Sequence, residues 1–292
     1  MTTAQTTTPA SAGADERATD PRAEIGVIGG SGLYEFLDDY ETVEVDTPFG
    51  RPSDPLVVGE VEGRSVAFVA RHGKGHRFAP HRVNYRANLW ALRAVGVRQI
   101  LSPCAVGSLR PEHGPGTIVV PDQVVDRTWG RAHTIYETEG PVVHVGFAEP
   151  YCPNGRSVAI DAARLSPLPV VADGTLVVVN GPRFSSRAES VMHQQAGFGI
   201  VGMTTMPEAA LARELAMCFT TIAMVTDHDA GIEGGEAVSH EEVLRVFATN
   251  VEHLSEILRD AIGQMPAHEP DETATCPCRR SLDGIELPFP LP

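Results

Sequence analysis

Lysine is almost absent from this sequence. Lys74 is the single lysine among 23 lysine and arginine residues. It lies in RHGKGH, which does not match the phosphate-binding loop GxxxxGK[ST]. We therefore expect neither a P-loop nor a Schiff-base mechanism. The formal net charge of −15 also argues against general binding to nucleic acid or to an anionic membrane, so neither is an expected partner.

Cysteine is scarce as well, with five residues in 292. An odd number of cysteines in a chain of this length does not indicate a secreted disulfide framework. Cys104, Cys152 and Cys218 are far apart in the sequence, whereas Cys276 and Cys278 form a CPC motif. This motif can be a thiol pair, a weak metal site or a part of the tail without function.

The sequence has no internal repeat and no Gly-, Ser- or Pro-rich linker that would divide it into domains. Residues 1–22 have a tail-like composition without the apolar core of a signal peptide, so we expect them to be disordered. Residues 23–264 are expected to form one domain, and residues 265–292 an irregular tail that packs on it. Because no run of about 18 apolar residues occurs, we expect no membrane span and a cytoplasmic location.

Apolar segments and helical periodicities alternate along the expected domain. Strands are predicted at residues 25–28, 56–61, 65–69, 99–102, 117–120 and 174–179, with Pro103 breaking the fourth. Helices are predicted at residues 85–95, 157–165, 207–217 and 239–262, the last with Ser239 and Glu242 as a capping box. The alternation predicts an α/β fold with a central sheet flanked by helices.

Residues 201–231 form the most informative segment. They are predicted to form a turn, an amphipathic helix and a buried strand that ends on Asp227 and Asp229. The carboxyl end of a parallel strand opens at the crevice where α/β proteins bind ligands, so both carboxylates are expected at a site. There they can hold or protonate a neutral, basic ligand, and the Met203-Thr204 turn would lie beside them if the two strands are neighbours. The alternative is helix capping or a solvated loop.

Two segments can bind an anion. The glycines of residues 29–32 permit close approach of backbone N–H groups, although a tight turn explains them equally well. Arg71 and His72 offer a guanidinium fork and a ring nitrogen for phosphate, with a surface salt bridge and a solvated histidine as the alternative. His72, His76 and His81 also allow a weaker metal interpretation, but no HExxH motif is present.

Two further segments have small or aromatic residues after a strand. Residues 104–108, CAVGS, permit close approach of a ligand, or simply pack. Phe184 can stack on a planar ring and Ser185 can hydrogen-bond to it, whereas the alternative is a core phenylalanine in a braced loop.

Ten motifs in register between residues 24 and 262 resemble the 5′-methylthioadenosine phosphorylase branch of the purine nucleoside phosphorylase family. They read IGVIGGSGLYEF, VDTPFGRPSDPL, ARHGKGH, VNYRANLWAL, AVGSLRP, VPDQVVDRT, AEPYCP, NGPRFSSRAES, VGMTTMPEAALARE and VTDHDAG. The resemblance implies a homotrimer with a mixed central sheet. It also implies inorganic phosphate as co-substrate, with no metal and no organic cofactor.

The resemblance also implies roles for individual residues. Phosphate would be bound by Ser31, Arg71, His72, the backbone of Cys104 and Ala105, and Thr204. The nucleoside would contact Met203, Phe184, Ser185, Asp227 and Asp229, and Asp227 would protonate or hydrogen-bond the departing purine at N7. Such a donor must be protonated, so we expect burial or the neighbouring Asp229 to raise its pKa. His144 would reach the 5′ pocket of a neighbouring subunit.

Two positions depart from that pattern. Relatives often have a hydroxyl or amide side chain at Cys104, so this contact is expected to be made by the backbone only. His240 stands where methylthio-specific enzymes tend to have an apolar residue, and where ordinary purine nucleoside phosphorylases have a histidine for the ribose 5′-hydroxyl. Val243 and Leu244 keep part of that pocket apolar, and Ser185 also bears on specificity.

The leading hypothesis is phosphorolysis of 5′-methylthioadenosine, because aspartate at Asp227 is associated with 6-aminopurines. A broader phosphorylase acting on adenosine or inosine is the alternative that His240 suggests. Outside this chemistry, a non-catalytic nucleoside-binding protein and a metallohydrolase remain as alternatives.

Overall fold

The computed structural model describes residues 22–30, 33, 37, 39–232 and 240–292, without the side chains of residues 240 and 242–244. Nearly all of the expected N-terminal tail, residues 1–22, and the expected helix cap at Ser239 therefore lie outside the described residues. Within them, no helix is both long enough and apolar enough to cross a membrane.

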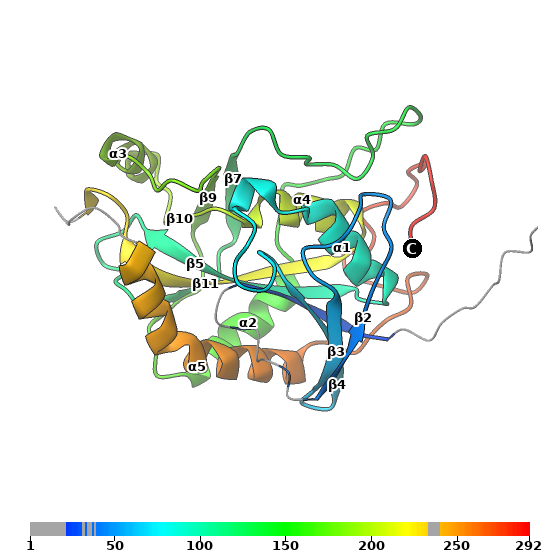
Figure 1. Cartoon of the computed structure of the whole chain (residues 1–292), viewed down its shortest axis with the longest axis horizontal. Helices are drawn as coiled ribbons and strands as arrows, with labels where there is room; N and C mark the ends of the chain where they lie inside the picture. Colours follow the sequence, from blue (N-terminus) through cyan, green and yellow to red (C-terminus); the bar gives the residue numbers. More distant parts are fainter. Residues whose placement is uncertain (1–21, 31–32, 34–36, 38, 233–239) are drawn as a thin grey trace, which may run out of the picture.

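The described residues form a mixed β-sheet with helices on both faces, which confirms the predicted α/β class (Figure 1). The strands are β1 (Ile25–Gly29), β2 (Tyr40–Val43), β3 (Leu56–Val61), β4 (Arg64–Ala70), β5 (Gln99–Ser108), β6 (Ile118–Val119), β7 (Gln123–Arg127), β8 (Val170–Val171), β9 (Thr175–Val179), β10 (Ile200–Gly202) and β11 (Cys218–His228). Their main order is β2-β3-β4-β1-β5-β10-β9-β7, and β11 pairs with β5 and β6.

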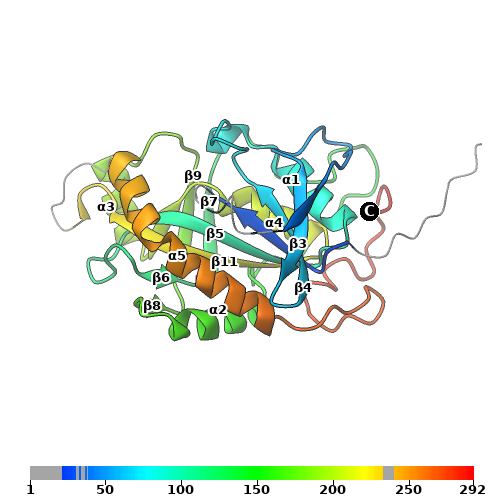
Figure 2. The same cartoon turned by 60° about the horizontal axis from the view of Figure 1, so that its bottom comes forward.

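The helices are η1 (Pro80–Arg82), α1 (Tyr85–Ala94), α2 (Pro153–Leu165), α3 (Arg187–Gln195), α4 (Thr205–Glu214) and α5 (His240–Gln264). Helices α2 and α5 pack together and against β11 on one face of the sheet (Figure 2). Helices α1 and α4 pack together on the other face. Helices on both faces thus cover the central strands β5 and β11. The side chains of these two strands are buried over most of the strand length.

Strand β5 corrects one prediction, because it continues past Pro103 to Ser108. Its parallel pairing with β1 ends at Leu101, whereas its pairing with β11 continues along the whole strand. Proline removes one N–H donor, and the side of β5 toward β1 no longer needs that donor beyond Leu101. The extension brings residues 104–108 alongside the end of β11.

Helix α3 was not predicted, although its start signal is present in the sequence. The Ser186 hydroxyl accepts from the Glu189 N–H at 3.3 Å, and the Glu189 carboxylate accepts from the Ser186 N–H at 2.7 Å. This reciprocal pair is a capping box. Helix α2 likewise starts earlier than predicted, at Pro153, where proline suits a first helical position.

The C-terminal residues contact the sheet domain through charged and aromatic groups. Asp271 accepts hydrogen bonds from Arg93 at 3.1 Å and Arg98 at 3.0 Å, and it also pairs with Arg279. The Phe289 ring lies 6.0 Å from that of Trp90. These contacts fasten the tail beside α1.

Candidate active site

A cavity of about 590 Å³ lies where β4, β5, β10 and β11 end. Ten of the residues that the sequence singled out line this cavity: Arg71, His72, Cys104, Ala105, Phe184, Ser185, Met203, Thr204, Asp227 and Asp229. They come from segments more than 150 residues apart in the chain, counting from Arg71 to Asp229. The position matches the crevice at the carboxyl ends of strands that the sequence predicted.

Gly107 makes room for the two carboxylates. The register between β11 and β5 shifts between Val225 and Asp227, which places Asp227 opposite Gly107. A Cβ atom at position 107 would lie 3.2 Å from Asp227 Oδ2 and 3.4 Å from Asp229 Cβ. A side chain there would press on the Asp227 carboxylate and contact Asp229, so the glycine leaves room for both beside the cavity.

Each carboxylate has a different neighbour. The Thr226 hydroxyl lies 2.7 Å from Asp227 Oδ1 and 3.3 Å from the Val106 carbonyl. The Ser190 hydroxyl on α3 donates to Asp229 Oδ2 at 2.5 Å, and Asp229 is only 4% exposed. A charged carboxylate can only accept, so the Ser190 hydroxyl donates and the bond fixes the orientation of Asp229.

Arg71 is held by a buried carboxylate that sequence reasoning missed. Its Nε donates to Glu208 Oε1 at 2.6 Å, and both side chains are at most 2% exposed. Nη2 donates to the Ser102 hydroxyl at 2.7 Å and Nη1 to the Pro103 carbonyl at 3.1 Å. Burial alone would lower the pKa of Arg71, but the Glu208 carboxylate raises it above its usual value.

This network fixes the guanidinium at the cavity wall. Nη1 lies near Gly30, where a Cβ atom would be 3.6 Å away. A guanidinium has five N–H donors, and an Nη1 nitrogen with one bond to Pro103 has a second hydrogen to offer. Because the Arg71 guanidinium is fixed, it can offer an anion one hydrogen bond of defined direction.

His72 is neutral at physiological pH. Burial and the neighbouring Arg71 cation lower the pKa of His72 to about 3. Its Nδ1 lies 2.8 Å from the Phe78 carbonyl, which can only accept, so Nδ1 bears the proton. The ring stacks on His76 with centroids 4.1 Å apart. Nε2 is therefore an acceptor, and it can donate to an anion only after the ring takes up a proton.

Cys104 is a thiol rather than a nucleophilic thiolate. Burial raises the pKa of Cys104 to about 11, although the Arg71 cation acts in the opposite direction. The adjacent Ala105 is exposed in the middle of β5 and faces the cavity. Small or uncharged side chains at both positions leave the backbone as the surface that a ligand meets.

Thr204 stands at the start of α4 with its hydroxyl uncommitted to the helix. It occupies the N-cap position but makes no side-chain capping bond. Beside it, Met203 packs on Gly181: a Cβ atom at position 181 would lie 2.6 Å from Met203 Sδ. Gly181 has a φ of 63°, a region that glycine adopts without strain. The loop that leads to Phe184 thus rests directly on Met203.

Arg131 braces this loop and α4 together. Its Nη2 donates to the Asn180 carbonyl at 2.8 Å and its Nη1 to the Met206 carbonyl at 2.5 Å. It is 8% exposed, and sequence reasoning did not single it out. Its guanidinium also lies over the Tyr85 ring, 5.4 Å from the centroid. One buried cation therefore sets the distance between the Phe184 loop and the helix that follows Met203.

Comparison with known proteins places these features in a family. Residues 24–263 match the sequence profile described as the phosphorylase superfamily. The chain is 58% identical over 282 residues to a purine nucleoside phosphorylase of Streptomyces coelicolor, covering 94% of this chain and 100% of that one. The chain belongs to the phosphorylase superfamily. It is thus an enzyme of the pentosyltransferase kind, which splits nucleosides with phosphate.

Other relatives of this phosphorylase are named for a different nucleoside. An S-methyl-5′-thioadenosine phosphorylase of Mycolicibacterium smegmatis is 51% identical over 270 residues, covering 92% of this chain and 99% of that one. A solved methylthioadenosine phosphorylase from an Antarctic soil metagenomic library superposes with a TM-score of 0.83 at 39% identity, covering 93% and 94% of the two chains. The relatives therefore agree on the chemistry and differ in the nucleoside named.

Some expected site residues of the phosphorylase are not placed in this cavity. Ser31 and the side chains of His240, Val243 and Leu244 lie outside the described residues. His144 is exposed, in the segment between β7 and α2, and does not line the cavity of its own chain.

The start of α5 does reach the cavity, through Phe247. Sequence reasoning missed this residue, although it comes four positions after Val243, which the resemblance assigns to the pocket. Of the three histidines in the metal interpretation, His81 does not line the cavity, and the ring of His76 stacks on His72. The described part of this cavity therefore gives the metallohydrolase alternative no support.

Proposed function

We propose that the chain catalyses phosphorolysis of 5′-methylthioadenosine to adenine and 5-methylthioribose 1-phosphate, a reaction of purine and methionine salvage. The observation that carries this proposal is the pair Asp227 and Asp229 beside Phe184 in one cavity. Adenine presents an acceptor at N7 and a donor at its 6-amino group, whereas a 6-oxopurine presents acceptors at both places. One protonated and one ionised carboxyl group complement adenine, because the first donates and the second accepts.

In the proposed reaction, the two carboxyl groups have different roles. Asp229, which already accepts from Ser190, stays ionised and accepts from the 6-amino group. Asp227, protonated, donates to N7. As the bond from C1′ to N9 breaks, its electron pair passes to the purine, and the Asp227 proton at N7 makes adenine a neutral leaving group. Phe184 packs on the purine face.

Phosphate would lie at the other end of the cavity. The second Nη1 hydrogen of Arg71, the Thr204 hydroxyl and the backbone of Cys104 and Ala105 would bind it, with Ser31 from the glycine-rich turn. One phosphate oxygen attacks C1′ as the purine leaves. The transition state has positive charge on the ribosyl ring, and an anion held in place beside it stabilises that charge. No metal or organic cofactor is needed for this step.

A second candidate is a broader purine nucleoside phosphorylase that also accepts a 5′-hydroxyl. Two observations favour it: the relative from Streptomyces coelicolor has that name, and His240 begins α5 close to the cavity-lining Phe247. A site that hydrogen-bonds a hydroxyl can reject an analogue without it by about 10⁴-fold, so the two candidates are distinguishable. A non-catalytic binding protein would not need Arg71 and Thr204, the proposed phosphate-binding side chains, in the same cavity.

The reaction is tested with purified protein, methylthioadenosine and inorganic phosphate. Adenine should appear only when phosphate is present, together with an equal amount of 5-methylthioribose 1-phosphate. Adenine release without phosphate would indicate a hydrolase, and no release at all would leave a binding function. Either result would overturn the proposal.

We also propose that the enzyme works as a homotrimer in the cytoplasm. The exposed His144 supports this, since a side chain outside its own cavity is free to complete the 5′ pocket of another subunit. The exposed Trp129, with 74% of its surface accessible, and the exposed Val142 in the same segment are apolar groups that a subunit contact would cover. Sedimentation equilibrium should give three times the chain mass of 31.2 kDa.

A further inference from the structure

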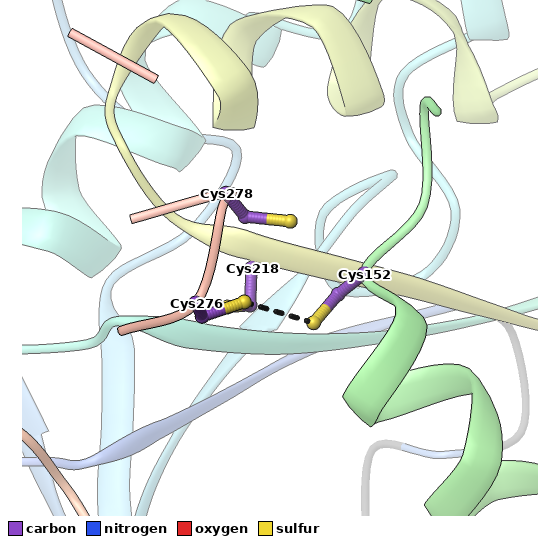
Figure 3. A group of neighbouring side chains, drawn as sticks. All are labelled: Cys152, Cys218, Cys276 and Cys278. Atoms are coloured by element: carbon purple, nitrogen blue, oxygen red, sulfur yellow. Dashed lines mark hydrogen bonds between the residues drawn. The ribbon is translucent and has the colours of Figure 1, made fainter. Parts of the chain in front are cut away.

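Four of the five cysteines meet in one cluster, at the far end of β11 from the cavity (Figure 3). Cys218 is the first residue of β11, and Cys152 directly precedes α2. Cys276 and Cys278 come from the C-terminal tail. The four sulfur atoms all lie within 4.8 Å of one another, and all five cysteines are free thiols.

The spacing of these sulfurs fits a tetrahedral metal site. Cys276 Sγ lies 3.6 Å from Cys152 Sγ and 3.5 Å from Cys218 Sγ. A zinc ion with Zn–S bonds of about 2.3 Å in tetrahedral geometry requires sulfurs about 3.8 Å apart. Small shifts of the side chains would therefore bring all four thiolates to bonding distance. Four sulfur ligands in a tetrahedron are typical of structural zinc.

The surroundings suit a cluster that becomes negatively charged. Three of the four cysteines are buried and Cys276 is partly buried. The Arg213 guanidinium lies 3.7 Å from Cys278 Sγ, and the Gly155 N–H donates to Cys152 Sγ at 3.4 Å. A cation and an N–H donor to sulfur compensate the net charge of −2 that one divalent ion and four thiolates have together.

We propose that Cys152, Cys218, Cys276 and Cys278 bind one Zn²⁺ ion, which fastens the C-terminal tail to the start of α2 and the start of β11. The CPC motif that the sequence left unassigned supplies two of the ligands. The ion has a structural role, because Asp227 lies nine positions after Cys218 along β11, or about 30 Å of strand. The site has no open position for a substrate.

The test measures metal in the full-length protein, purified without a metal-affinity column. Elemental analysis should find one zinc per chain. The double variant Cys276→Ser/Cys278→Ser should lose it, whereas the matched variant Cys104→Ser, at the remaining cysteine, should keep it. Removal of the metal by a chelator should lower the thermal midpoint of unfolding, and added Zn²⁺ should restore it.

A second measurement does not depend on the folding of any variant. Reduced, metal-free protein titrated with Co²⁺ should develop the intense visible bands of a tetrahedral thiolate site, with an endpoint at one ion per chain. Protein that binds neither Zn²⁺ nor Co²⁺ after reduction would overturn the proposal. Disulfides among these four cysteines found by non-reducing mass spectrometry of the purified protein, or zinc lost equally from the Cys104→Ser variant, would overturn it as well. Because the readouts are metal content and spectra, the result does not depend on which nucleoside the enzyme cleaves.

Discussion

Asp227 and Asp229 are two residues apart, yet their surroundings differ in a way that fits different roles. The Ser190 hydroxyl on α3 bonds Asp229, whereas Asp227 is bonded by the hydroxyl of its own neighbour on β11, Thr226. In the proposed reaction, one protonated and one ionised carboxyl group bind adenine, because the first donates to N7 and the second accepts from the 6-amino group. Under that proposal, the choice between 6-amino- and 6-oxopurines depends on these two side chains.

The substitution Asp227→Asn tests this choice. Asparagine keeps a donor but cannot give up a proton, so kcat/KM for methylthioadenosine should fall by about 100-fold or more. Turnover of 6-oxopurine nucleosides should fall less, since an amide can donate to an acceptor without being protonated. Steady-state kinetics on both classes measures the effect, with the exposed Asp161→Asn on α2 as control. Equal losses on both classes would contradict the assignment.

Glu208 is expected to matter for stability, because it is the buried partner of Arg71. The substitution Glu208→Gln would leave a buried guanidinium without its counter-charge, at a cost of about 3–5 kcal/mol. Urea unfolding of the variant, beside the exposed Glu256→Gln, measures this cost. A loss no larger than that of the control would show that Glu208 does not neutralise Arg71.

The low pKa of His72 predicts a dependence of stability on pH. Between its unfolded value of 6.5 and its folded value of about 3, only the unfolded chain binds a proton at this ring. Acidification through this window therefore favours the unfolded state, by up to about 1.4 kcal/mol per pH unit. The variant His72→Gln should lose stability less steeply from pH 6.5 down to pH 4 than the parent does. The same substitution at the partly exposed His253 controls for removal of a histidine. Identical slopes in parent and His72→Gln would contradict the prediction.

At the scale of elements, the loop after β9 positions the nucleoside side of the cavity. Gly181 and Gly63 have similar positive φ values, 63° and 71°, but only Gly181 has a close neighbour, Met203. Alanine at either position should cost about 1–2 kcal/mol for the left-handed backbone. Gly181→Ala should also displace Met203 and raise KM for the nucleoside several-fold, whereas Gly63→Ala should not. Unchanged nucleoside KM in Gly181→Ala would show that Met203 does not depend on this contact.

Much of the fold and most of the cavity lining could be predicted from the sequence. Apolar runs bounded by glycine and charge located β1, β3, β4, β9 and β11, and helical spacing located α1 and α5. The continuation of β5 past Pro103 could not be predicted, because a missing N–H is tolerated only where the pairing with β1 has already ended. The pairing of Arg71 with Glu208 was missed for a related reason. The two residues are 137 positions apart in the sequence. A glutamate in the first turn of a helix usually indicates a side chain exposed to solvent.

At the scale of the whole molecule, β11 runs from the cysteine cluster to the cavity, two sites with different chemistry. One end presents Asp227 to the cavity, and the other presents Cys218 to the cysteine cluster. The apolar strand between them is buried and paired with β5 throughout. A rigid central strand keeps the carboxylates in register with Gly107. The tail contacts at Asp271 and Phe289 lie outside the cavity. We therefore expect them to affect the stability of the fold more than the reaction.

The most direct test of the central claim varies the 6-position and the 5′-group of the nucleoside separately. Phosphate-dependent base release would be measured for methylthioadenosine, adenosine, inosine and 5′-methylthioinosine. The account predicts the highest kcat/KM for methylthioadenosine, with each 6-amino compound cleaved faster than its 6-oxo counterpart. Faster cleavage of inosine than of methylthioadenosine would contradict it.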